Sequence, residues 1–413
     1  MVTISLTMKR VALRLLLLAA ATALLSSCAE TPIRSIDRTD LFSLDIGRSE
    51  NEVDLFQLER FPMSRKTELY MRDGVIYISN GPANKVMEFT SYGDLVSLVY
   101  NARENPEPVL LQSNASDKTI SNRRAFSYAF NQVGEIAVTS ERTLLVEDRL
   151  TDERSMRDEE LGVSLNRSVL RFDANGQLLD YLGQEGIGGT PFPFIEDLHV
   201  TGRDEIVVVS RTEDTWLIFW YNSDGDPLYN VEIPRARLPI PEGEDVIPVL
   251  EKIIPDRRAA KLYLKLNYYK QSIDEQTGAA YGIDVLESRV YTLDLNSGAY
   301  ESFVTVPKNV QDPPPGQLFS DEKIEYLYEF IGAAPGEHLY FISRESERRS
   351  QLLIMNTEGR VLKRRYLQLD DSEIVYQKMH VSPQGIVTAL LASEKQVELV
   401  WWRTDRLIED VSG

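Results

Sequence analysis

A short unit recurs five times along the chain: an apolar, strand-like run followed by a polar turn that ends in glycine. In one copy, residues 169–172 precede a turn over 173–176. Asp or Asn at the start of such a turn bonds its own backbone, and glycine at its end supplies a positive φ. Because a second apolar run follows each turn, every copy predicts a β-hairpin. The turn glycines are Gly93, Gly176, Gly225, Gly298 and Gly359.

Two further strand-like runs precede each hairpin, as residues 197–200 and 205–210 do in the third unit. Four antiparallel strands form one blade of a β-propeller, and we count six such units. The last unit ends after its third strand, at residues 397–403. A spare strand at residues 41–46 precedes the first unit, and we expect it to complete the last blade, since closure removes an open edge. The sequence therefore predicts an all-β, six-bladed propeller of four-stranded antiparallel blades.

The N-terminal segment has the parts of a secretory signal. Lys9, Arg10 and Arg14 precede an apolar run over residues 15–25. That run is shorter than the roughly 20 apolar residues that a membrane-spanning helix needs. It ends in a tetrapeptide that resembles the bacterial lipobox, in which a peptidase cleaves before a cysteine whose thiol carries a diacylglycerol. The tetrapeptide is Leu25, Ser26, Ser27 and Cys28.

The lipobox divides the chain into three parts. We expect a lipoprotein signal peptide over residues 1–27, an acylated Cys28 with a tether over residues 28–40, and the propeller over residues 41–413. The alternative is an ordinary signal peptide in which Cys28 occurs by chance. Several acyl chains, palmitate among them, would attach the protein stably to a membrane, at roughly 0.8 kcal/mol per buried CH₂.

The charge composition limits the classes of partner that the chain can bind. The chain has 45 Lys and Arg against 64 Asp and Glu, a net charge of −19, which argues against nucleic acid because phosphate backbones bind clustered basic residues. Removal of residues 1–27 takes away three basic side chains and no acidic ones. Anionic bilayers would repel such a body, so the lipid must hold it. We expect a monomer in the bacterial cell envelope, anchored on the periplasmic or outer-membrane face.

The second unit carries a family resemblance. Residues 169–176, the glycine-rich segment 183–189 and the Pro-Phe-Pro-Phe of residues 191–194 are similar to the NHL-type repeat. The whole chain also resembles a spirochaetal-type group of bacterial envelope lipoproteins built from a lipobox and a six-bladed propeller. The resemblance implies this fold and this location, and it implies no particular activity.

One position in each blade is the candidate ligand site, because propellers bind ligands at the mouth of the central channel. We take residues 128–130 and 135–139 as the first two strands of the second unit, with a polar connection over 147–167. Charges of opposite sign in neighbouring blades would form a ring of ion pairs, and a ligand-binding rim is the other interpretation. The candidate rim residues are Glu68, Tyr128, Asp197, Lys252, Glu329 and Lys378.

Motifs for catalysis are scarce. No G-x-S-x-G, H-E-x-x-H or C-x-x-C is present, and a single cysteine excludes a disulfide framework. His199 and His380 fall at matching positions of the third and sixth units, but a metal would need a further carboxylate ligand. We therefore predict no catalytic residue, no metal and no cofactor.

Two functions stay open. The favoured one is a membrane-anchored, non-enzymatic module that binds an envelope protein, a peptide or another ligand, or that assists assembly. The alternative is an NHL-like envelope hydrolase or lyase with its site in the central channel. The residues that line the channel discriminate between them: converging histidines and carboxylates favour the enzyme, and paired charges favour the binding module.

Overall fold

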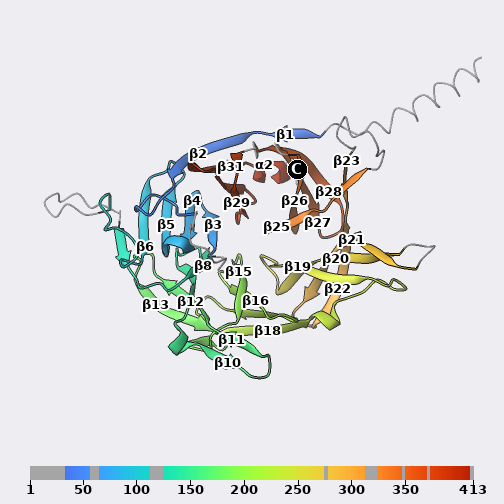
Figure 1. Cartoon of the computed structure of the whole chain (residues 1–413), viewed down its shortest axis with the longest axis horizontal. Coiled ribbons are helices and arrows are strands. Elements are labelled where there is room, and N and C mark those ends of the chain that lie inside the picture. Colours follow the sequence, from blue (N-terminus) through green and yellow to red (C-terminus); the bar gives the residue numbers. More distant parts are fainter. Residues whose placement is uncertain are drawn as a thin grey trace, which may run out of the picture. The chain divides into compact units, whose positions relative to one another are not determined.

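The computed structural model describes residues 33–55, 65–111, 124–273, 278–311, 323–346, 349–369 and 373–409. The chain divides into two units, Met1–Arg34 and Ser35–Gly413, and the blades belong to the second. Six antiparallel sheets stand radially around a central axis, as Figure 1 shows, so the six-bladed propeller is confirmed. Cys28 and the rest of the lipobox lie outside the described residues.

Each blade runs outward from an inner strand at the axis. Blade one contains β3 (Thr67–Arg72), β4 (Val75–Asn80), β5 (Lys85–Thr90), β6 (Leu95–Tyr100) and β7 (Arg124–Ser127), the last parallel to β6. Blade two contains β8 (Val133–Val138), β9 (Leu144–Arg149), β12 (Arg167–Phe172), β13 (Leu178–Gly183) and β14 (Gly186–Ile187). Blade three contains β15 (Phe194–Val200), β16 (Ile206–Arg211), β17 (Thr215–Tyr221) and β18 (Pro227–Pro234).

The remaining blades follow the same order. Blade four contains β19 (Ile247–Pro255), β20 (Lys261–Ile273), β21 (Ala280–Asp294) and β22 (Ala299–Val306). Blade five contains β25 (Glu329–Ala334), β26 (His338–Ser346), β27 (Arg349–Asn356), β28 (Val361–Gln368) and the short β1 (Arg34–Ile36). Blade six contains β29 (Tyr376–Val381), β30 (Val387–Ala392), β31 (Gln396–Trp402) and β2 (Arg38–Asp45).

Smaller elements lie in the connections within and between blades or follow the last strand. Two short hairpins pair β10 (Met156–Asp158) with β11 (Val163–Leu165), and β23 (Asn309–Gln311) with β24 (Ile324–Tyr326). The described part of the chain also has single-turn 3₁₀ helices at η2 (Gly81–Ala83), η3 (Asp152–Arg154) and η4 (Arg235–Arg237), and a short α-helix, α2 (Asp405–Glu409). Within the described ranges, no helix has the length and apolar character to cross a bilayer.

The apolar cores lie between neighbouring blades. One cluster joins blades three and four through residues such as Val209, Ile218 and Leu264, and another joins blades five and six through Ile354 and Val400. A blade in the ring has both faces covered, so its middle strands are apolar on both sides rather than alternating. The run Ile-Val-Val-Val in β16, buried throughout, has this pattern.

The N-terminal strand closes the ring, as predicted. β2 pairs antiparallel with β31, with Arg38 opposite Trp402 and Asp45 opposite Gln396, and Figure 1 shows these two strands side by side. The turn glycines also have the expected backbone: φ is 86° at Gly93 and 97° at Gly225. Strand pairing begins before residue 41, however, because β1 and the start of β2 lie within residues 34–40.

The second unit differs from its prediction. Residues 128–130 form no strand, and β8, which we took for the second strand, is the inner one. The second strand is β9. Its charged residues Glu147, Asp148 and Arg149 are typical of a loop, which is why the sequence predicts a polar connection there. Glu147 and Asp148 are buried, and Glu147 forms ion pairs with Lys66 at 3.1 Å and Arg167 at 3.2 Å.

Candidate functional site

All six inner strands contribute residues to one cavity on the propeller axis. Its volume is about 100 Å³, and its lining comes from β3, β8, β15, β19, β25 and β29, with Arg257 in the turn after β19. Side chains two residues apart on a strand share a face. The lining is therefore layered: Asp197 lies one layer from His199, and Lys378 one layer from His380.

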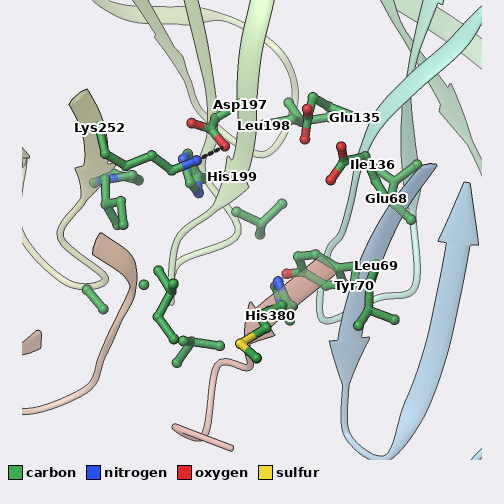
Figure 2. A pocket seen from close by; sticks show the side chains of 18 of the residues that line it. Glu68, Leu69, Tyr70, Glu135, Ile136, Asp197, Leu198, His199, Lys252 and His380 are labelled. Carbon is green, nitrogen blue, oxygen red and sulfur yellow. Dashed lines mark hydrogen bonds and ion pairs between the residues drawn. The ribbon is translucent and has the colours of Figure 1, made fainter. Parts of the chain in front are cut away.

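The first layer consists of ion pairs between blades. Lys252 of blade four contacts Asp197 of blade three at 2.6 Å, and Lys378 of blade six contacts Glu68 of blade one. Lys66, which precedes β3, contacts Glu135 of blade two at 3.0 Å. Figure 2 shows the Lys252–Asp197 pair, and it shows Glu68 and Glu135 turned towards each other. Among the described residues, these pairs link blades six to one, one to two, and three to four.

Burial and neighbouring charge shift the pKa values in this layer. Burial, followed by the negative charge of Glu135, raises the pKa of Glu68 to about 7. Burial alone would lower the pKa of Lys378, but the carboxylates of Glu68 and Glu135 raise it instead. Asp197 raises the pKa of Lys252 against the same opposing effect of burial. The lysines therefore stay charged at neutral pH, and Glu68 is poised near its titration.

Four of the six predicted rim residues lie in the cavity: Glu68, Asp197, Lys252 and Lys378. Tyr128 does not, because blade two begins with β8 rather than with residues 128–130. Its half-buried ring instead packs against Phe130 and Phe172, at centroid distances of 4.8 Å and 5.4 Å. In blade two, the cavity residue is Glu135, which the sequence places on the second strand of the blade and the structure places on the inner one.

Glu329 also lies outside the cavity lining, at the exposed start of β25. A β-bulge explains the error. Register shifts occur just before Asp197, just before Lys252, and between Phe330 and Gly332. Alignment on these bulges makes Gly332 the equivalent residue in blade five. A Cβ there would lie 2.5 Å from Val381 Cβ, so glycine lets blades five and six approach closely.

The second layer contains the two histidines. The rings of His380 and Tyr70 lie 4.5 Å apart, and His199 follows Asp197 on β15. Burial, opposed by Asp197, lowers the pKa of His199 to about 4, while burial and then the positive charge of Arg257 lower that of His380 to about 3. Both imidazoles are therefore neutral at pH 7. Within the described ranges, no group of three His, Cys, Asp or Glu is arranged to hold a metal ion.

Sequence reasoning missed Lys66, Glu135 and Arg257, and only Glu135 left a usable signal. It is the one acidic residue in the apolar run of β8, and Figure 2 shows its carboxylate in the cavity. Lys66 and Arg257 lie just outside the inner strands, where strand periodicity does not position a side chain. The cavity as a whole offers paired charges, two neutral imidazoles and one unpaired guanidinium, an arrangement suited to binding.

No protein-family model matches the chain, and no curated protein matches it. Solved structures do resemble it. A gluconolactonase from Xanthomonas campestris is 12% identical over 91% of this chain and 99% of its own, with a TM-score of 0.38. The calcium-binding protein regucalcin from Agrobacterium tumefaciens is 10% identical over 90% and 95%, with a TM-score of 0.37. A polysaccharide lyase is 8% identical over 90% and 99%, with a TM-score of 0.41. These likenesses carry no argument about activity.

Proposed function

We propose that this chain is a lipid-anchored binding module of the bacterial cell envelope. Cys28 would carry the lipid after removal of residues 1–27, and the propeller would bind an envelope protein, a peptide or another ligand. The observation that carries the binding role is the pairing of channel charges across blades, Lys252 with Asp197 and Lys378 with Glu68. Charges that neutralise each other between blades hold a rigid ring, which suits presentation of a binding surface.

The anchor is tested by metabolic labelling with palmitate in the native host. We expect the wild-type protein to incorporate label and to fractionate with membranes. The matched Cys28→Ser variant should lose the label, because only a thiol forms the thioether. Equal labelling of the two proteins would disprove the anchor.

The binding role is tested separately on tagged protein from detergent-solubilised envelopes. Wild type and Cys28→Ser should capture the same envelope component in near-stoichiometric amounts, because the propeller rather than the lipid makes the contact. Turnover of an envelope polymer by the purified protein, without a retained partner, would instead support the hydrolase or lyase interpretation.

A further inference from the structure

Arg257 is a cation of the cavity without a counter-charge among the described residues. Its neighbour Asp256 is engaged elsewhere: its carboxylate accepts a hydrogen bond from the Tyr263 hydroxyl at 2.5 Å and from the backbone N–H groups of Arg258 and Ala259, each at 2.7 Å. Arg257 has no ion pair in the described part of the chain, and burial lowers its pKa. A guanidinium in this position favours an anion.

The two histidines beside Arg257 have unused hydrogen-bonding capacity. The Nε2 atoms of His199 and His380 are both buried, and neither has a partner in the described structure. All three side chains line the same cavity. Buried polar atoms are normally hydrogen-bonded, so two orphaned ones on the wall of a cavity leave room for a bound water or ligand to satisfy them. The guanidinium and an N–H of the His199 imidazole are donors suited to a carboxylate, whereas Nε2 of His380 is an acceptor because its other ring nitrogen bonds the backbone of Met71.

The first layer has an unused acceptor. Lys252 occupies one oxygen of Asp197, and the other, Oδ2, is buried without a partner in the described residues. Asp197 and His199 are two residues apart on β15, roughly 6.6 Å along the strand. A short molecule can therefore reach both. The cavity of about 100 Å³ has room for it, since a single water needs about 10–15 Å³.

We propose that the cavity binds a small organic carboxylate that carries a hydrogen-bond donor at its other end. The carboxylate lies against Arg257 and His199, and the hydroxyl or amino group donates to Oδ2 of Asp197. Nε2 of the neutral His380 is an acceptor, because the other ring nitrogen bonds the backbone of Met71, so it faces the donor end of the ligand rather than the carboxylate. This inference deepens the binding role proposed above and does not depend on the lipid.

The proposal is tested by titration calorimetry on the Cys28→Ser protein, with glycolate, acetate and inorganic phosphate as probes. Glycolate should bind more tightly than acetate, because acetate lacks the donor for Asp197, and phosphate should bind more weakly than glycolate. Arg257→Gln should weaken glycolate binding by about tenfold or more, the usual effect of losing a charge-assisted hydrogen bond. Arg258→Gln, at the exposed neighbouring residue, is the matched control and should bind as the parent protein does.

Binding by the parent protein that Arg257→Gln leaves unchanged, or no heat with any probe at millimolar concentration, would overturn the proposal. Equal affinities for glycolate and acetate would remove the role of Asp197. Circular dichroism of Arg257→Gln checks that its propeller is folded. A negative calorimetry result would leave palmitate labelling and capture of an envelope component unaffected. The failure of the carboxylate site can therefore be distinguished from failure of the anchored binding module.

Discussion

At the scale of single residues, the channel shows how the same ion-pair geometry has different energetic weight in different surroundings. The Lys252–Asp197 and Arg211–Glu196 pairs both have 2.6 Å contacts. The side chains of the first pair are 27% and 11% exposed, and those of the second are 47% and 30% exposed. Water screens the second pair more strongly, so its contribution to stability should be smaller.

A double-mutant cycle measures this difference. Lys252→Met leaves the Asp197 carboxylate buried and unpaired, so we expect a loss of about 1–3 kcal/mol in the free energy of unfolding. Adding Asp197→Asn should cost less than the sum of the single changes, with a coupling energy of at least about 1 kcal/mol. The matched cycle of Arg211→Met and Glu196→Gln should give a coupling energy of about 0–1 kcal/mol. Urea denaturation measures both cycles. A larger coupling for the second pair would contradict this account.

The low pKa of buried His380 predicts that the free energy of unfolding depends on pH. The unfolded chain protonates His380 below its ordinary pKa of 6.5, whereas the folded protein does so only near pH 3. The contribution of His380 to the free energy of unfolding is therefore full above pH 6.5. It decreases as the pH falls from 6.5 towards 3, by at most about 1.4 kcal/mol per pH unit. His380→Gln removes the loss, so wild type should lose stability relative to the variant between pH 7.5 and pH 5.

Urea unfolding of both proteins at several pH values provides the measurement. Tyr70, Lys378, Arg257 and His199 remain around the substituted position, so their own contributions largely cancel in the comparison. Protonation of Glu68, whose pKa is raised in the folded protein, stabilises the fold as the pH falls. This contribution is present in both proteins and cancels in the comparison. A constant stability difference across this pH range would show that the folded protein protonates His380 normally.

At the scale of elements, β2 combines a hydrogen-bonded ladder with one deeply buried side chain. Leu44 is 6% exposed and packs with Val397 and Leu399 of β31, whereas the adjacent Ser43 faces solvent. Leu44→Ala should lower the free energy of unfolding by about 2–4 kcal/mol, because it leaves a cavity in the contact that closes the ring. Ser43→Ala should change it by less than about 0.5 kcal/mol.

Thermal and urea unfolding of the two variants test the role of this strand. Both substitutions place alanine in the same strand, and they differ chiefly in the size and burial of the side chain that is removed. Equal effects would indicate that β2 contributes little packing to blade six.

Elements also show which features the sequence could predict. Turn chemistry is local, so Gly93 and Gly225 identified their hairpins, and the spare strand near residue 41 identified the closure. Bulges are not visible in the spacing of apolar residues, so Glu329 was aligned in place of Gly332. The orphaned Nε2 atoms of His199 and His380 depend on packing between blades, which single-strand patterns do not encode.

At the scale of the whole molecule, the described blades are held by three kinds of contact between neighbours. Apolar clusters fill the spaces between sheets, ion pairs join the inner strands, and long-range hydrogen bonds join distant parts of the sequence. The Tyr376 hydroxyl, for example, donates to the carbonyl of Thr67 at 2.5 Å and so connects blade six to blade one. Loss of one interface therefore weakens its neighbours, because each blade is covered on both faces.

The placement of β1 and β2 has a mechanical consequence. β1 pairs with β28 in blade five, and β2 pairs with β31 in blade six, so the first strands of the propeller straddle a seam between blades. Tension applied through the N-terminal end would meet two separate ladders in succession before it reached any inner strand. Under such a load β1 and β2 would separate from their ladders first, and the inner strands that line the axial cavity would bear it last.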